Sequence, residues 1–343
     1  MIRPLAALAI PCVAWAWAWA WGDVAAAQTA PIAIVETHVL PAFATLDTAA
    51  SGLESAALAE CNPTAPALRA AYGAAFDAWV SVSHIRLGPT ERADRGFALA
   101  FWPDNRGRTP KSLTAMIRAE DPVVEDGAEF RTVSVAVRGF YALEFLLYDP
   151  AFADLGGPDY RCRLIQAIAR DIAQNAAEIL AEWRSIEAEL FATAGENDTY
   201  RSVDEANQAL FKALSTGLEF TRDLRLGRPL GTFERPRPNR AEARRSGRSL
   251  RHVELALAAL RDLALMLADG DDALRETLTR GFDRALDLAG KLDDPVFAGV
   301  ADPSGRFRIE ALQSAVKDVH AVVLGQLGPK LGVAAGFNSL DGD

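Results

Sequence analysis

Tyr141 and Glu144 are the side chains whose types and spacing most clearly suggest chemistry in this sequence. They lie three residues apart in the segment GFYALEFLL, residues 139–147. On an α-helix, positions i and i+3 share a face, so both side chains would point toward one place. There they could form a buried hydrogen-bonded pair that stabilises the helix, or they could offer oxygen ligands to a metal ion.

The metal chemistry open to this pair is narrow. A tyrosine has an ordinary pKa of about 10, so its phenol seldom ligates zinc at neutral pH. A ferric ion prefers oxygen ligands and can stabilise a phenolate. In the metal hypothesis Glu144 and Tyr141 are the ligands. The sequence does not identify the cofactor, and the candidate is an iron or other metal ion.

A buried Glu144 needs a partner, because an isolated carboxylate in apolar surroundings is costly. The sequence offers four arginines as candidate partners: Arg138, Arg86, Arg106 and Arg245.

Motifs of common hydrolases are missing from the sequence. Its four histidines, His38, His84, His252 and His320, nowhere form the His-Glu-x-x-His helix of zinc peptidases. There is also no Gly-x-Ser-x-Gly nucleophile elbow, phosphate loop or dinucleotide fingerprint. Composition and motifs therefore leave enzymatic activity uncertain and favour a binding role.

The elements that must position these residues are helices. Apolar residues recur every three or four positions in nearly every segment, which predicts an all-α fold. The clearest case is one long amphipathic helix over residues 159–191, with Trp183 on its buried stripe, and Pro41 is expected to kink the first helix. The other expected helices cover residues 35–53, 65–85, 110–117, 129–147, 202–224, 253–267, 274–288 and 308–324.

Length suggests two domains, because single cores rarely grow beyond about 250–300 residues. The turn-rich stretch 195–199 follows the long helix and is the best boundary. We expect a signal peptide over residues 1–27, an N-terminal helical bundle over 28–195 and a C-terminal helical bundle over 196–343.

The N-terminus has the pattern of a cleaved signal peptide. Arg3 precedes an apolar run from Leu5 to Trp21, and small residues follow it at 24–27. The run is shorter than the roughly 20 residues of a spanning helix, so we expect no transmembrane span after cleavage. Export would place the mature chain in the periplasm or cell envelope.

Cysteine content fits an exported chain. Without the leader, only Cys61 and Cys162 remain, and an even pair in an oxidising compartment predicts a disulfide. The formal net charge is −10, with no basic stripe interleaved with aromatic residues, so nucleic acid is excluded as a partner.

Four stretches in order resemble the imelysin-like family, a bacterial envelope family linked to insulin-cleaving metallopeptidases and to iron-regulated proteins. They are residues 139–147, residues 79–107 with HIRLGP and FWPDNRG, residues 241–250 with AEARRSGRSL, and the C-terminal LGV and GFNSLDGD. The family signature Gly-x-His-x-x-Glu has its histidine position occupied by Tyr141. This departure weakens the transfer of the family's metal chemistry.

The resemblance implies two packed helical bundles with a cleft between them, where these motifs gather. The candidate ligand-binding residues are then Tyr141, Glu144, Arg138, His84, Arg86, Trp102, Asp104, Arg106, Glu242, Arg245 and Ser246. For several of them structural roles compete: a hydrogen-bonding role near a helix end for His84, loop anchoring for Trp102 and Asp104, and helix capping for Glu242 and Ser246. The arginine-rich stretch 240–251 is either a solvated face or an anion-binding surface.

The expected function is an envelope component that binds a small ligand or metal species, or an uptake partner, in connection with iron uptake or regulation. The enzyme alternative is a metal-dependent peptidase in which Glu144 is a ligand or general base. A further alternative is a protein-interaction module of the envelope.

Overall fold

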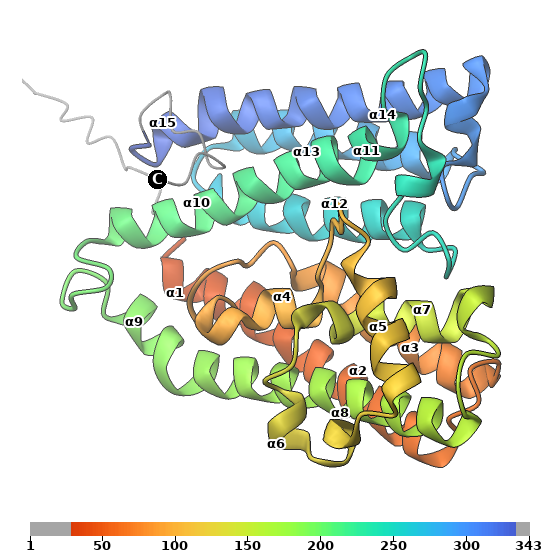
Figure 1. Cartoon of the computed structure of the whole chain (residues 1–343). Helices are drawn as coiled ribbons and strands as arrows, with labels where there is room; N and C mark the ends of the chain where they lie inside the picture. Colours follow the sequence, from red (N-terminus) through yellow and green to blue (C-terminus); the bar gives the residue numbers. More distant parts are fainter. Residues whose placement is uncertain (1–28, 334–343) are drawn as a thin grey trace, which may run out of the picture.

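The computed structural model describes residues 29–333, and within this range the fold is all-α, as predicted (Figure 1). No strand occurs among these residues, where the only extended pairing is an isolated bridge between Thr232 and Arg235. The longer helices are α2 (Leu40–Ala59), α3 (Pro66–Val82), α5 (Arg108–Ala119), α7 (Gly139–Tyr148), α8 (Pro158–Glu182), α10 (Val203–Glu219), α12 (Ser249–Leu267), α13 (Asp272–Gly290) and α14 (Pro303–Val322). The short ones are α1 (Pro31–Ile34), α4 (Arg95–Leu99), α6 (Gly127–Phe130), α9 (Ala188–Ala192), α11 (Gly227–Leu230) and α15 (Gly328–Lys330).

Several helices continue through π-helical turns. The turn Trp183–Glu187 joins α8 to α9, so helical structure runs over residues 158–192 and confirms the long helix predicted for 159–191. The turn Phe220–Leu226 likewise extends α10 into α11. Another, Val35–Val39, ends two residues before Pro41, where a kink was predicted. Such single π turns are frequent at functional sites.

The helices pack in two groups, which Figure 1 shows one above the other. In the earlier part of the chain α2 packs against α3 and α8, and in the later part α13 packs against both α12 and α14. The α3–α12 contact joins the groups, and α1 contacts both α9 and α10. The proposed domain division at residues 195 and 196 stays a prediction.

The helix predicted over residues 129–147 is wrong in its first half. That stretch holds the end of α6, turns and a 3₁₀ turn at Val135–Val137, and α7 begins only at Gly139. Gly139 has φ +72°, and a Cβ there would lie 2.2 Å from the carbonyl oxygen of Ala98. The close approach of the α4 backbone therefore requires glycine at this position and fixes where α7 starts.

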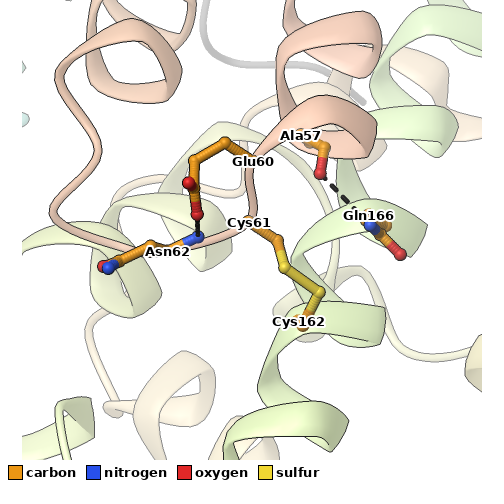
Figure 2. Close-up of a disulfide and its surroundings, with 6 residues drawn as sticks. All are labelled: Ala57, Glu60, Cys61, Asn62, Cys162 and Gln166. Carbon is orange, nitrogen blue, oxygen red and sulfur yellow. Dashed lines mark hydrogen bonds between the residues drawn. A yellow bond between two sulfur atoms is a disulfide. The ribbon is translucent and has the colours of Figure 1, made fainter.

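Cys61 and Cys162 form the predicted disulfide, with Cα atoms 5.2 Å apart. Figure 2 shows that it ties the chain just after α2 to the beginning of α8. Across residues 29–333, no helix is both long enough and apolar enough to cross a membrane. The predicted signal peptide and the final GFNSLDGD motif lie outside the described residues.

Candidate functional site

Glu242 is the centre of a buried polar network that joins the two groups of helices. The Tyr141 hydroxyl, on α7, donates to Glu242 Oε1 at 2.6 Å. Arg225, in the π turn after α10, donates through Nε to Glu242 Oε2 at 2.8 Å. His252 Nδ1, on α12, lies 3.2 Å from the same oxygen. All four side chains are buried, so the network is shielded from solvent.

The charges of this network follow from its geometry. Burial alone would raise the pKa of Glu242, but the charge of Arg225, with His252 and the hydrogen bond from Tyr141, holds that pKa well below its usual range. Burial, followed by the charge and hydrogen bond of Glu242, raises the pKa of Tyr141 well above the ordinary value. Glu242 is therefore an ionised carboxylate, and Tyr141 remains protonated and donates a hydrogen bond to it.

Glu144 has a different partner from those the sequence suggested. Its Oε1 accepts hydrogen bonds from the backbone N–H of Ser246 at 2.9 Å and from the Ser246 hydroxyl at 2.7 Å. Burial raises the pKa of Glu144, while both bonds from Ser246 act in the opposite direction. Tyr141 and Glu144 thus share a helix but form hydrogen bonds with different residues. The expectation that they form a hydrogen-bonded pair with each other was wrong.

The four arginines proposed as partners of Glu144 are engaged elsewhere or exposed. Arg138 forms a buried two-bond pair with Asp171 at 2.9 and 2.7 Å, and Arg245 pairs with Asp149. Arg86 pairs with Glu91, and Arg106 is exposed. Among the described residues Glu144 therefore has no direct arginine partner, because a backbone N–H and a hydroxyl satisfy it, although the charge of Arg245 also acts to lower the pKa of Glu144.

A cavity of about 450 Å³, here the first cavity, opens beside this network. Its walls are mainly apolar, with Trp79, Trp102, Phe220 and Leu260 among them. The buried polar residues that reach it are His84, Tyr141, Arg225 and Glu242, and the exposed charged residues on its lining are Glu91, Lys212 and Asp223.

His84 lies on the wall of the first cavity. Its Nε2 lies 3.1 Å from Nε2 of His38, and its buried Nδ1 has no hydrogen-bond partner within residues 29–333. Burial, then the charges of His38 and Arg225, lowers the pKa of His84 well below the ordinary value. The ring is therefore neutral near pH 7.

A second cavity of about 240 Å³ shares a wall with the first. Trp102 and Tyr141 line both cavities, and their rings are stacked with centroids 6.2 Å apart. Asp104 also lines the second cavity, but its carboxylate accepts the backbone N–H groups of Arg106, Arg108 and Thr109 at the start of α5. Asp104 thus anchors the loop that carries Trp102.

The ligand-binding residues predicted from the sequence fall into three sets, according to which of the two cavities they line. The first cavity is lined by His84, Arg86, Trp102, Tyr141 and Glu242, and the second by Trp102, Asp104, Tyr141, Glu144 and Arg245. Three candidates line neither cavity: Arg138, Arg106 and Ser246.

Sequence reasoning missed Arg225, the cation that pairs with Glu242. The helix predicted over 202–224 ended one residue before it, whereas the π turn continues through Leu226. Arg225 follows four residues after Thr221, to which it also donates at 3.2 Å. Extending the predicted helix to residue 225 would have placed Thr221 and Arg225 on one face and could have indicated the hydrogen bond between these two residues.

The donor set around Tyr141 does not fit a metal ion well. Glu242 is already neutralised by Arg225, and Tyr141 holds its proton. Over the described part of the chain, no group of three or more histidine, cysteine, aspartate or glutamate side chains could hold a metal. The predicted metal ligands Glu144 and Tyr141 are therefore not accompanied in this range by a metal-binding group of such side chains.

Comparison with known proteins agrees with this architecture. A sequence model of the imelysin family matches residues 39–323, and the chain belongs to that family. The fold is similar to that of an imelysin-like protein from Psychrobacter arcticum 273-4, with a TM-score of 0.75 and 18% identity over 92% of this chain and 100% of the other. It is also similar to a protein described as an iron-regulated protein A precursor from Parabacteroides distasonis ATCC 8503, with a TM-score of 0.73 and 13% identity over 88% of this chain and 94% of the other. No curated protein matches the chain in sequence.

Proposed function

We propose that this imelysin-family protein is an exported, ligand-binding component of the cell envelope, and that the first cavity holds a small organic molecule with a large apolar surface. The volume of that cavity, about 450 Å³, carries the proposal. Pockets for small molecules typically measure about 300–1,000 Å³ and combine apolar walls with a few convergent polar groups. Trp79, Trp102 and Leu260 supply the walls here.

The polar groups of the cavity favour a ligand that also carries a hydrogen-bonding group. Lys212 and Thr216 lie on the lining, where Arg86 and Arg225 are paired with the lining carboxylates Glu91 and Glu242. A bare metal ion is the weaker candidate, because the one buried carboxylate on this lining is paired with Arg225.

An iron-related role, in uptake or regulation, is part of the proposal and draws on the description of the Parabacteroides distasonis protein. In such a role the cargo would be an organic species that fits the apolar walls. The signal peptide expected at residues 1–27 supports the envelope location.

Binding can be tested with the fluorescent probe 8-anilinonaphthalene-1-sulfonate, which combines an apolar body with an anionic group. We expect saturable binding at one site, with energy transfer from tryptophan, because Trp79 and Trp102 both lie on the cavity wall. The variants Ala209→Phe and Thr216→Phe fill the cavity from α10 and should abolish this binding. The matched control Ala74→Phe, at an exposed position on α3 outside both cavities, should leave it unchanged.

Two outcomes would overturn the proposal. One is probe binding that the cavity-filling variants do not weaken in protein whose near-UV circular dichroism is intact. The other is chelator-sensitive peptide cleavage by the purified mature protein that is lost in Glu144→Ala, because it would establish the metal-dependent peptidase instead.

A further inference from the structure

The second cavity is lined by two arginines that have no carboxylate partner in the described part of the chain. Arg228, on α11, and Arg240, at the end of the 3₁₀ turn Pro238–Arg240, both line it. Neither forms an ion pair within residues 29–333, and the buried Nε of the half-buried Arg228 has no hydrogen-bond acceptor there. The Arg228 guanidinium lies 5.4 Å from the centre of the Trp102 ring, which holds it at the cavity wall.

The acidic side chains of this cavity do not balance the two arginines. Asp104 accepts three backbone N–H groups, and Glu144 accepts both donors of Ser246. The third arginine of the lining, Arg245, is already paired with Asp149. The guanidinium groups of Arg228 and Arg240 are thus the charged donors of this cavity that have no carboxylate partner among the described residues.

The two unpaired guanidinium groups repel each other. Burial, and then the charge of Arg240, lowers the pKa of Arg228 below the ordinary arginine value. Such an arrangement is unfavourable in the empty cavity, and an anion between the two groups would offset the repulsion. Arginine is suited to this because its planar donors match the oxygens of phosphate and carboxylate groups.

We infer that the second cavity is a binding site for a small oxyanion, free phosphate or sulfate or the carboxylate of an organic acid, held by Arg228 and Arg240. The side-chain amides of Asn105 and Asn239 also line the cavity and can donate to the same oxygens. This site is separate from the first cavity, because the stacked rings of Trp102 and Tyr141 form the wall between them. The inference is therefore independent of the ligand proposed for the first cavity.

The test is a titration of the mature protein with sodium phosphate, sodium sulfate and sodium succinate, each at constant ionic strength maintained with sodium chloride. Isothermal calorimetry would follow binding, together with the intrinsic tryptophan fluorescence, to which Trp102 on the cavity wall contributes. We expect saturable one-to-one binding of at least one of the three anions. A preference for phosphate and sulfate would identify a tetrahedral oxyanion as the natural ligand, and a preference for succinate would identify a carboxylate.

Variants test whether the anion binds in the second cavity. Arg228→Gln and Arg240→Gln should each weaken anion binding at least tenfold, and Arg240→Gln should fold normally because Arg240 is exposed. The control Arg235→Gln removes the same charge from an exposed position of the same loop that lines neither cavity, and it should bind as the parent does. Absence of saturable binding by all three anions, or equal weakening in Arg235→Gln and Arg240→Gln, would overturn the inference.

Discussion

Replacing Arg225 by methionine should be among the most destabilising changes to a polar residue in this protein. Arg225 and Glu242 have side chains only 5% and 4% exposed, and their Nε–Oε2 distance is 2.8 Å. Removing one member of a buried ion pair typically costs about 3–5 kcal/mol, because the other charge is left buried without compensation. Tyr141 and His252 still contact Glu242, so we expect Arg225→Met to lower the free energy of unfolding by about 3 kcal/mol, at the lower end of that range.

A double-mutant cycle isolates the interaction energy between Arg225 and Glu242 from the contributions of their other contacts. Glu242→Gln should also be strongly destabilising, because the buried Arg225 would be left without an anionic partner and would keep only neutral ones such as the Thr221 hydroxyl and the face of the Phe220 ring. The double variant Arg225→Met with Glu242→Gln should lose less than the sum of the single losses, by about 2 kcal/mol or more, within the range measured for residues in contact. The control Arg261→Met breaks a solvent-exposed pair with Asp283 and should cost about 0–1 kcal/mol.

Urea unfolding followed by circular dichroism at several pH values provides the assay. The folded-state pKa of Glu242 lies below its ordinary value, so its contribution to stability is present above about pH 4.5 and is lost as the pH falls toward the folded-state pKa. The difference between the parent and Arg225→Met should therefore shrink at low pH. Additive losses in the cycle, or a loss below about 1 kcal/mol in Arg225→Met at pH 7, would refute the account of this network.

Two further changes test the fold that supports the site. Replacing Cys61 and Cys162 by serine opens a loop of sequence separation 101 and should lower the free energy of unfolding by about 4–5 kcal/mol on the chain-entropy model; an unchanged urea midpoint would contradict this. Gly139→Ala should lower the yield of soluble protein sharply, because the new Cβ would lie 2.2 Å from the Ala98 carbonyl oxygen at φ +72°. The control Gly52→Ala, on α2 with no atom within 4 Å of the added Cβ, should be neutral or stabilising, and equal yields of the two variants would contradict the steric argument.

Helical periodicity predicted most of the architecture because it reports the buried face of a single element. It placed the long helix over residues 159–191 and put Trp183 in the core, where this residue is fully buried and stacks on Phe43. Periodicity failed before Gly139, since a close approach to the backbone of another helix leaves no periodic signal.

The candidate site was only partly accessible from sequence for a related reason. Tyr141 and Glu144 were expected to act together because they share a face of α7. Each instead bonds to a residue about one hundred positions later, Glu242 and Ser246 respectively. Local spacing shows which side chains point the same way, but their partners depend on how α7 meets the loop before α12.

A crystal structure of the mature protein grown with both 8-anilinonaphthalene-1-sulfonate and Fe(III) tests the central claim most directly. The account predicts density for the probe in the first cavity, against Trp102 and near Arg225, with Tyr141 still bonded to Glu242. It also predicts no anomalous iron signal between Tyr141 and Glu144. An iron peak at that position, with the first cavity free of the probe, would contradict the proposed ligand-binding function.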